Sequence, residues 1–448
     1  MMTIAAAAQA IGATARGAAS FARVTTDSRQ IEAGDLFVAL RGEKFDGHQF
    51  AQAALDAGAA AVMVDTDGAA DLSPAVVVTD TRLALGQLAA YWRQQMPARI
   101  IGVTGSSGKT SVKEMLAAIL CAAVGEDAVL ATQGNFNNDI GMPLTLLRLR
   151  AEHQYGVIEM GMNHAGELEY LTRLAQPDVA LINNAGTAHV GILGSVAAIA
   201  AAKGEILLGL PADGVAVINA DDEFASLWRQ GAGTRAVIDF GLRRATIVKG
   251  KYAAHAAYSD VEITAPNMQL QVKLPVLGEH SVMNALAATA AAIAVGTGGA
   301  AIVAGLQGFK GVYGRLQRKQ AVRGAVLIDD SYNANPDSTR AAIKVLAAAT
   351  GRKLLVLGDM GELGADAAAM HTEIGTLARQ AGIDNLYALG ELSGNAVAAF
   401  GSGALHFADV EALTAALLPQ LTTDVTVLVK GSRFMQMERV VKIIEEKA

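Results

Sequence analysis

A short stretch of glycine, serine, lysine and threonine has the residue types that bind phosphate. It consists of Gly105, Ser106, Ser107, Gly108, Lys109, Thr110 and Ser111, between the apolar run 100–104 and a predicted helix over residues 112–123. In such a strand–loop–helix unit, backbone N–H groups and the helix dipole attract polyphosphate. Lys109 would contact the terminal phosphates, and the hydroxyl of Thr110 would bind Mg²⁺. The segment therefore predicts the use of ATP.

The glycine spacing of this loop departs from the general Walker pattern, because Val103 occupies the position five residues before Gly108. An ordinary strand-to-helix turn with a surface lysine is the alternative. The order Gly-x-x-Gly-Lys-Thr at the end of an apolar strand makes that alternative the weaker one.

Three titratable residues accompany the next predicted strands. Glu159 stands at the end of one strand, where a carboxylate could bind Mg²⁺ directly or through water. His189 lies in the loop after the following strand and gains interest only if it comes close to Glu159; otherwise it is a surface residue. Lys203 lies in an alanine-rich helix over residues 195–210, and its surroundings in the sequence favour a solvent-exposed lysine.

Polar loops also follow the predicted strands of the C-terminal third. Residues 329–336, 358–364 and 430–433 each come directly after such a strand. Because the carboxyl ends of parallel strands meet at one edge of a sheet, we expect these loops to form a common binding face.

Two further segments are ambiguous by composition. The asparagines of residues 135–143 favour a turn. Ser28 and Arg29 follow Asp27 in a predicted loop, where an arginine could bind a diphosphate through paired hydrogen bonds. Turn chemistry is the simpler explanation of that loop.

The elements that must position these residues divide the chain into three α/β units, residues 1–97, 98–314 and 315–448. The second unit alternates strands and helices, which predicts a parallel sheet; its strands cover residues 100–104, 156–160, 179–183, 215–219 and 236–240, followed by an antiparallel pair within 261–276. The third unit restarts this pattern as a second doubly wound sheet, with strands over residues 325–328, 353–357, 385–389 and 426–429.

Composition excludes several classes of protein. A net charge of −7 over 448 residues argues against a nucleic-acid partner. The single cysteine, Cys121, cannot form an internal disulfide. Residues 281–307 carry no charge, but glycines interrupt them and predict two buried helices instead of a membrane span. No positively charged segment precedes the apolar N-terminus, so we expect a soluble, cytoplasmic protein without membrane insertion.

Taken together, the motifs resemble the Mur ligase family. Residues 104–110 have the form of the ATP loop of these enzymes, which explains the glycine spacing. Residues 135–143, 330–338 and 358–364 resemble the branch of the family that adds D-alanyl-D-alanine. The resemblance extends from Asp27 to Arg433, which is essentially the whole chain.

The resemblance implies an α/β protein of three domains: a small N-terminal UDP-substrate domain, a central P-loop ATPase domain with a parallel sheet, and a C-terminal Rossmann-like doubly wound domain. It implies catalytic roles for Lys109, His189 and Lys203. The implied Mg²⁺ ligands are Thr110, Glu159, His189 and Lys203, the last as a carbamylated lysine. Besides the loop residues 105–111, the implied ATP contacts are His280, Asn284, Arg315 and Asp330. The implied substrate contacts are Ser28, Arg29, Asn137, Asn138, Tyr332, Asn333, Asn335, Lys430 and Arg433.

The activity implied by the resemblance is the ATP-dependent joining of D-alanyl-D-alanine to UDP-N-acetylmuramoyl-tripeptide through an acyl phosphate, with ADP and phosphate as products. That reaction would supply a pentapeptide precursor of peptidoglycan. The alternatives are another carboxylate–amine ligase of the superfamily, either one that adds the third peptide residue or a folylpolyglutamate synthase, and a non-catalytic nucleotide switch. We expect the chain to act as a monomer.

Overall fold

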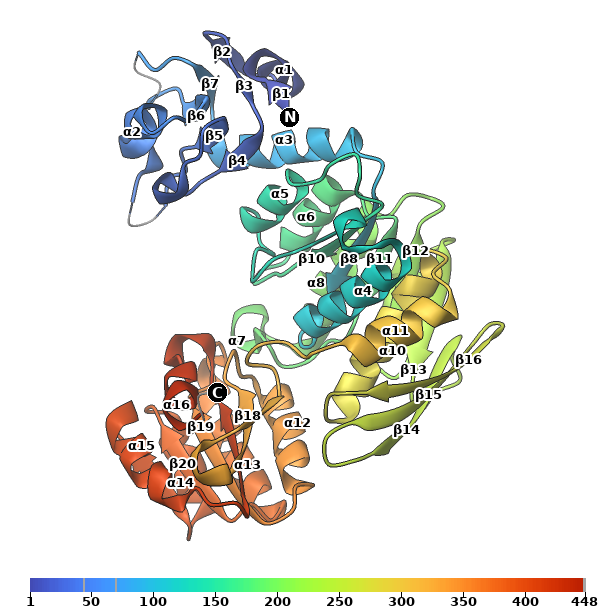
Figure 1. Cartoon of the computed structure of the whole chain (residues 1–448), viewed down its shortest axis with the longest axis vertical. Coiled ribbons are helices and arrows are strands. Elements are labelled where there is room, and N and C mark those ends of the chain that lie inside the picture. The colour runs from blue at the N-terminus through green and yellow to red at the C-terminus, as the bar shows by residue number, and fades with distance from the viewer. Residues whose placement is uncertain (43–44, 69–70, 446–448) are drawn as a thin grey trace.

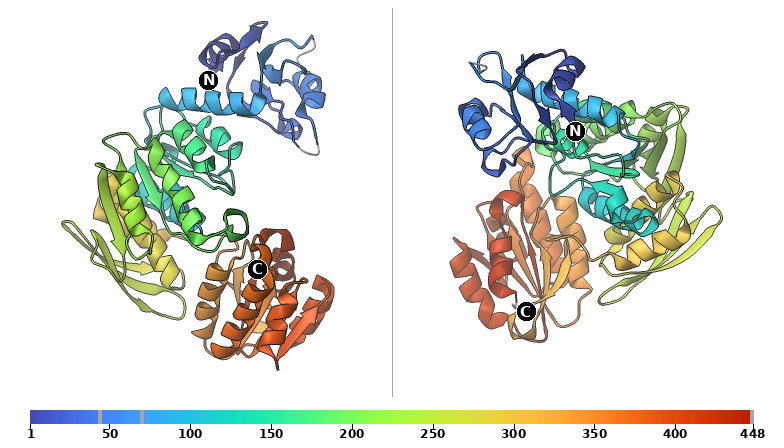
Figure 2. Two further views of the ribbon diagram at one scale, coloured as in Figure 1. Left: turned by 180° about the vertical axis from the view of Figure 1, so that it is seen from behind. Right: turned by 45° about the horizontal axis from the view of Figure 1, so that its top comes forward.

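The computed structural model of the chain describes residues 1–42, 45–68 and 71–445. Three α/β units follow one another along the long axis of the molecule, with the N-terminal unit at one end and the C-terminal unit at the other (Figure 1). The view from behind in Figure 2 shows the same order. Each unit is built around one of the three larger sheets.

The N-terminal unit contains a five-stranded sheet in the order β2-β7-β6-β5-β4. Strands β4 to β7 are parallel and β2 is antiparallel to β7. The residues of β5 and β7 are all buried, as expected of parallel strands covered on both faces. The elements are β1 (Met2–Thr3), α1 (Ile4–Ala10), β2 (Thr14–Arg16), β3 (Ser20–Phe21), β4 (Arg23–Thr25), β5 (Asp35–Val38), α2 (Ala51–Asp56), β6 (Ala61–Asp65), β7 (Ala75–Val78) and α3 (Thr81–Gln94).

The central unit contains a nine-stranded sheet in the order β16-β15-β14-β13-β12-β11-β8-β10-β9. Strands β8 to β14 run parallel, and β15 and β16 extend the sheet as antiparallel strands. The strands are β8 (Arg99–Thr104), β9 (Val129–Ala131), β10 (Tyr155–Glu159), β11 (Val179–Ile182), β12 (Val215–Asn219), β13 (Ala236–Gly241), β14 (Val248–Ala254), β15 (Ser259–Ala265) and β16 (Met268–Leu274). The helices are α4 (Lys109–Val124), α5 (Gly141–Leu146), α6 (Glu167–Ala175), α7 (Val190–Leu193), α8 (Val196–Gly204), α9 (Ala225–Ala232), α10 (Glu279–Ala294) and α11 (Gly299–Gly308).

Helices cover both faces of the central sheet, because successive side chains of each strand point to opposite faces. Ile101 and Val103 of β8 pack into one core with α4, α10 and α11. Ile100 of the same strand packs into a second core with α5, α6, α8 and α9. The phosphate-binding loop thus leaves the carboxyl end of a fully covered central strand, where ligands of parallel sheets bind.

The C-terminal unit contains a six-stranded sheet in the order β17-β18-β22-β19-β20-β21, with only β17 antiparallel. Helices α15 and α16 cover one face, and α12, α13 and α14 cover the other. The elements are β17 (Gln317–Gln320), β18 (Val326–Asp330), α12 (Pro336–Ala347), β19 (Arg352–Gly358), α13 (Ala367–Gln380), β20 (Asn385–Leu389), α14 (Ser393–Phe400), β21 (Ala404–Phe407), α15 (Val410–Leu417), β22 (Val425–Lys430) and α16 (Glu438–Ile444).

The three-domain α/β architecture expected from the sequence is confirmed, and the predicted strands of the second and third units are present within two residues of their expected bounds. In these two units, strands β9, β14, β17 and β21 were not predicted. The helix expected over residues 195–210 is shorter, because α8 ends at Gly204 and a 3₁₀ turn follows over Glu205–Gly209. The division of the chain at residues 97 and 314 stays a prediction that the three separate sheets support.

The uncharged segment 281–307 forms the two helices α10 and α11, as predicted. Gly296, with φ 82°, lies in the turn between them. Within the described parts of the chain, no helix is long and apolar enough to cross a membrane.

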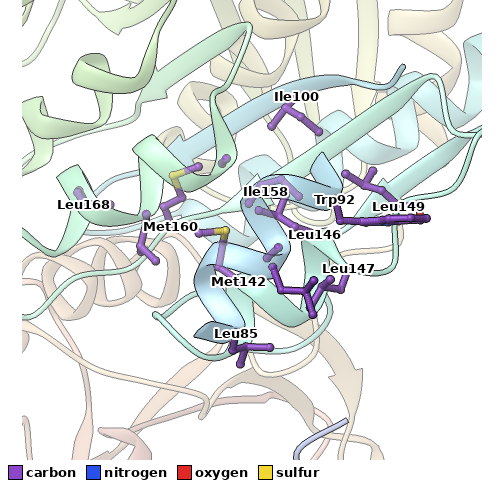
Figure 3. Packing of buried hydrophobic residues seen from close by; sticks show 14 of the residues in the cluster. Leu85, Trp92, Ile100, Met142, Leu146, Leu147, Leu149, Ile158, Met160 and Leu168 are labelled. Atoms are coloured by element: carbon purple, nitrogen blue, oxygen red, sulfur yellow. The ribbon is translucent and has the colours of Figure 1, made fainter. Parts of the chain in front are cut away.

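Helix α3 joins the first two units through a shared apolar core. Leu85 and Trp92 of α3 belong to the same buried cluster as Ile100 of β8 and Met142 of α5 (Figure 3). The indole Nε1 of Trp92 donates a hydrogen bond to the carbonyl oxygen of Leu149 at 3.0 Å. The N-terminal unit is therefore held to the central unit by hydrophobic burial.

Replacing Leu85 by alanine should destabilise both units together, because the removed side chain is completely buried in the core that they share. We expect Leu85→Ala to lower the free energy of unfolding by about 2–5 kcal/mol in urea titrations followed by circular dichroism. The control is Leu83→Ala on the same helix, whose side chain is 53% exposed and which should change stability by less than about 0.5 kcal/mol. Equal effects of the two variants would contradict the shared core.

Candidate active site

The phosphate-binding loop joins β8 to α4, and its last glycine has a conformation that favours glycine. Gly108 precedes α4 with φ 82°. Nδ2 of Asn183 donates hydrogen bonds to the carbonyl oxygen of Ser107 at 3.0 Å and to Oδ1 of Asn284 at 2.9 Å. A Cβ atom at residue 108 would lie 2.4 Å from Oδ1 of Asn284. Backbone and packing both require glycine here, which leaves the N–H groups of the first turn open to a phosphate.

Lys109 begins α4, and its ammonium group contacts the loop itself. Nζ donates a hydrogen bond to the carbonyl oxygen of Gly105 at 2.7 Å. Burial lowers the pKa of Lys109, and the nearby carboxylate of Glu159 opposes this shift. A desolvated cation is stabilised by an anion close to it. A phosphate in the loop would therefore be a favourable partner for this side chain.

Glu159 ends β10 with one carboxylate oxygen paired and the other free. Its Oε1 accepts a hydrogen bond from Nδ2 of Asn137 at 2.7 Å. Its Oε2 is buried and has no hydrogen-bond partner among the residues that the structure describes. A buried, unpaired carboxylate oxygen is costly unless a cation or a donor reaches it. Glu159 therefore fits a Mg²⁺ ion, which prefers oxygen ligands.

Side chains alone do not complete a metal centre here. No group of three or more His, Cys, Asp or Glu side chains within residues 1–42, 45–68 and 71–445 could hold a metal ion. Mg²⁺ in nucleotide sites is usually held by one or two carboxylates together with phosphate oxygens and water. A single free carboxylate oxygen beside a phosphate-binding loop is in keeping with that mode.

His189 contacts the C-terminal unit. The residue has a left-handed backbone, with φ 67°, in the loop before α7. Its Nδ1 lies 2.7 Å from Oε2 of Glu362, an ion-pair distance at which the two groups are not aligned as a hydrogen bond. The proximity of His189 lowers the pKa of Glu362. Glu362 lies in the predicted polar loop 358–364, but nothing in the sequence singled out this residue within it.

Lys203 is buried on α8, contrary to the exposed position that its neighbours in the sequence favoured. Burial lowers its pKa well below the usual value, and the charge of Lys109 lowers it further. The described part of the chain offers its ammonium group no hydrogen bond or ion pair. Burial without a partner favours the neutral amine of a lysine, which is the nucleophilic form.

The edge of the C-terminal sheet is tied together by Lys430. Its Nζ donates hydrogen bonds to Oδ2 of Asp330 at 2.6 Å and to the carbonyl oxygen of Asn333 at 3.0 Å. Burial lowers the pKa of Lys430, and Asp330 opposes this shift. The loops after β18 and β22 are thus fixed to each other, as the predicted common binding face requires.

Two arginines lie near the ring of Tyr332. The guanidinium carbon of Arg315 is 4.4 Å from the centre of the tyrosine ring, and that of Arg433 is 5.6 Å from it. Arg433 also donates a hydrogen bond from Nη1 to Oε1 of Glu438 at 2.8 Å. An aromatic ring stabilises cations above its face. The ring therefore holds two positive charges close to one another, where they can attract an anionic group.

Polar contacts hold the C-terminal unit against the loops of the central unit. Nδ2 of Asn335 donates a hydrogen bond to Oγ of Ser107 at 3.2 Å. Oδ2 of Asp337 accepts hydrogen bonds from the backbone N of Thr187 at 2.7 Å and from its Oγ1 at 2.9 Å. A Cβ atom at Gly186 would lie 2.5 Å from the same carboxylate oxygen. Sequence reasoning missed the contact between Thr187 and Asp337, because it joins two segments that are distant in the sequence.

These two units enclose a cavity of about 1440 Å³. Burial lowers the pKa of one of its lining residues, His280. The cavity brings together most of the residues that the sequence analysis singled out: Ser106, Ser107, Gly108, Lys109, Thr110, Ser111, Asn137, Asn138, Glu159, His189, His280, Asn284, Arg315, Asp330, Tyr332, Asn333, Asn335, Lys430 and Arg433.

Four of the predicted site residues lie outside the cavity lining: Gly105, Lys203, Ser28 and Arg29. The last two lie in the N-terminal unit, in a 3₁₀ turn after Asp27. Arg29 forms an ion pair with Asp27 at 2.8 Å and lowers the pKa of that carboxyl group to about 2. The structure therefore places this pair away from the phosphate-binding loop.

Three family models match the chain: the Mur ligase family catalytic domain over residues 20–93, the Mur ligase middle domain over 103–292, and the Mur ligase glutamate ligase domain over 314–433. A curated protein from Escherichia coli (strain K12), named UDP-N-acetylmuramoyl-tripeptide--D-alanyl-D-alanine ligase, is 46% identical over 94% of this chain and 93% of its own length. The chain belongs to the Mur ligase family.

Solved structures agree with this assignment. MurF from Acinetobacter baumannii is 37% identical, with a TM-score of 0.92 over 100% of this chain and 99% of that chain. The MurF ligase from Thermotoga maritima, solved in complex with ADP, is 28% identical, with a TM-score of 0.85 over 94% of this chain and 96% of that one. The three-unit arrangement described above is therefore that of the family.

Replacing Gly108 by alanine should abolish nucleotide binding in this Mur ligase, since the new Cβ would push against Asn284 and displace the loop. Gly125, at the other end of α4, provides the control: its φ is 91°, but no atom lies within 4 Å of its Cβ position. Both variants strain the backbone by roughly 1–3 kcal/mol, yet only Gly108→Ala should lose affinity for ADP in calorimetric titrations. Similar affinities in both variants would contradict this role.

Proposed function

We propose that the chain is an ATP-dependent ligase that joins D-alanyl-D-alanine to UDP-N-acetylmuramoyl-tripeptide, forming the UDP-linked pentapeptide with ADP and phosphate as products. The observation that carries the proposal is the cavity in which the phosphate-binding loop faces the polar loops of the C-terminal sheet. The relatives described above carry the name of this activity, which favours it over another ligase of the superfamily. A non-catalytic switch would need no such second binding face.

The reaction requires activation of a carboxylate, which is a poor electrophile. A carboxylate oxygen of the tripeptide attacks the γ-phosphorus of ATP, and ADP leaves. The amine nitrogen of D-alanyl-D-alanine then attacks the acyl carbon, loses a proton and displaces phosphate. Phosphoryl transfer depends mainly on positioning and on charge stabilisation. A cavity between two units can also exclude water, which would otherwise hydrolyse the acyl phosphate.

We assign a role in this scheme to each predicted residue. Lys109 and the N-terminus of α4 stabilise the transferred phosphoryl group. His280, Asn284, Arg315 and Asp330 contact the nucleoside end of ATP or its phosphates. We assign Asn137, Asn138, Tyr332, Asn333, Asn335, Lys430 and Arg433 to the peptide substrates. Ser28 and Arg29, which lie outside the cavity lining, are assigned to the uridine diphosphate.

Mg²⁺ would be held by Glu159, Thr110 and His189. Glu159 offers its free carboxylate oxygen, and the hydroxyl and imidazole groups line the same cavity. When bound, the ion supplies positive charge to the phosphate oxygens.

We propose that Lys203 is carbamylated. The neutral amine of a lysine adds to the carbon of CO₂, forming an N-carboxylate and releasing one proton. Burial with no hydrogen-bond or ion-pair partner among the described residues favours the neutral amine, and the product is an anion that a metal ion or Lys109 can stabilise. A cytoplasmic location, suggested by the requirement for ATP, and the monomeric state stay predictions.

The experiment that tests the proposed function is ADP release by the purified protein with ATP, Mg²⁺ and UDP-N-acetylmuramoyl-tripeptide, with and without D-alanyl-D-alanine. We expect steady release of ADP only with the dipeptide, together with the pentapeptide product in mass spectra.

Lys109→Ala should reduce the rate of ADP release by at least about a hundredfold, with an unchanged circular dichroism spectrum. Lys310→Ala, at an exposed position, is the matched control. If the wild type releases ADP at the same rate with and without the dipeptide, the proposed function is overturned.

Lys203→Ala should lose most of its activity, because the variant cannot form the carbamate. Added formate or acetate should restore part of that activity by placing a carboxylate in the space of the missing side chain. The measurement is ADP release against carboxylate concentration, with the wild type as the control for salt effects. An alanine variant with unimpaired activity would show that Lys203 has no part in the reaction.

A further inference from the structure

Helix α4 contains a second buried lysine, to which the proposed reaction assigns no role. Lys113 lies one turn after Lys109 and is fully buried. Its Nζ donates a hydrogen bond to the carbonyl oxygen of Thr132 at 2.6 Å. Its charge is balanced by Oε1 of Glu114 at 2.6 Å, and the Glu114 side chain is 43% exposed. An apolar residue of similar length would fill this space without the cost of desolvating a charge.

The contacts of Thr132 lead directly to Glu159. Thr132 follows β9 and is buried. Its backbone N donates a hydrogen bond to the carbonyl oxygen of Val157 at 3.0 Å. Its Oγ1 accepts a hydrogen bond from the backbone N of Glu159 at 3.0 Å. The pairing of β9 with β10 ends at Ala131 and Val157, so this hydroxyl extends the ladder to the residue whose carboxylate faces the cavity.

We infer that Lys113 is a positioning residue for the carboxylate of Glu159. Lys113 fixes the backbone of Thr132, and the Thr132 hydroxyl fixes the backbone of Glu159. Because Lys113 and Lys109 share one helix, this chain of contacts sets the distance between the free carboxylate oxygen and the phosphate-binding loop. The inference rests on the proposed function, since it assumes that Glu159 holds a divalent ion beside ATP.

The Thr132 hydroxyl provides the sharpest test. Thr132→Val keeps the shape of the side chain but leaves the backbone N–H of Glu159 without its acceptor, whereas Thr132→Ser keeps the hydroxyl. The measurement is the affinity of the full-length protein for Mn²⁺ in the presence of a non-hydrolysable ATP analogue, followed by electron paramagnetic resonance. We expect Thr132→Val to bind Mn²⁺ about 10–100-fold more weakly, as residues that orient metal ligands generally show, and Thr132→Ser to match the wild type.

Lys113→Met tests the other end of the chain of contacts. It should weaken Mn²⁺ binding to a similar extent, and Lys113→Arg should recover part of the loss. Glu114→Gln is the control, because it removes only the exposed partner. The double variant Lys113→Met, Thr132→Val should lose no more than either single variant, since both act through Glu159. Affinity for the nucleotide in the absence of divalent ions should stay unchanged in all of them.

The outcomes separate this inference from the proposed function. If the wild type releases no ADP on addition of the dipeptide, the proposed function fails. If the wild type is active but Thr132→Val binds Mn²⁺ as tightly as Thr132→Ser, the positioning role is overturned. A variant with a lower melting temperature and unchanged Mn²⁺ affinity overturns the positioning role as well, because it shows that the contacts only support the fold.

Discussion

The site depends on one constraint: several lysine side chains are buried, and few buried carboxylates lie beside them. Among Lys113, Lys203 and Lys430, which are all buried, only Lys430 pairs with a buried carboxylate, that of Asp330. Burial also lowers the pKa of Lys109 in the phosphate-binding loop. Desolvated cations raise the free energy of a folded chain until anions approach them. The chain can therefore bind polyphosphate locally, although its net charge is −7.

Neutral groups complete the phosphate site where further cations would repel one another. The amides of Asn183 and Asn284 hold the loop around Gly108, and Asn137 occupies one oxygen of Glu159. An amide donates and accepts hydrogen bonds but carries no charge. It can therefore fix a loop or a carboxylate in place while the lysines supply the positive electrostatic potential. The asparagine-rich segments of the sequence have this physical purpose in the central unit.

The sequence predicted the helices and strands better than it predicted the side-chain contacts between them. Apolar strands followed by polar loops indicated both doubly wound sheets, because a buried parallel strand cannot be polar. Strand β17, Gln317–Gln320, has no apolar residue, and no periodicity could reveal it. Lys203 looked like a surface residue, since its burial depends on how α8 packs. The contacts of Glu362, Asp337 and Lys113 join segments distant in the sequence, and only the fold brings those segments together.

The two junctions between units differ in what holds them. The N-terminal and central units share one apolar cluster through α3, so separating them would expose buried side chains to water at about 25 cal/mol for each Å². The clusters of the C-terminal unit contain no residue before Leu316 among those described. Its docking rests on hydrogen bonds and ion pairs such as Asp337 with Thr187 and Glu362 with His189. Water can replace such contacts at little cost in free energy. We therefore expect the C-terminal unit to separate from the central unit more easily than the N-terminal unit does.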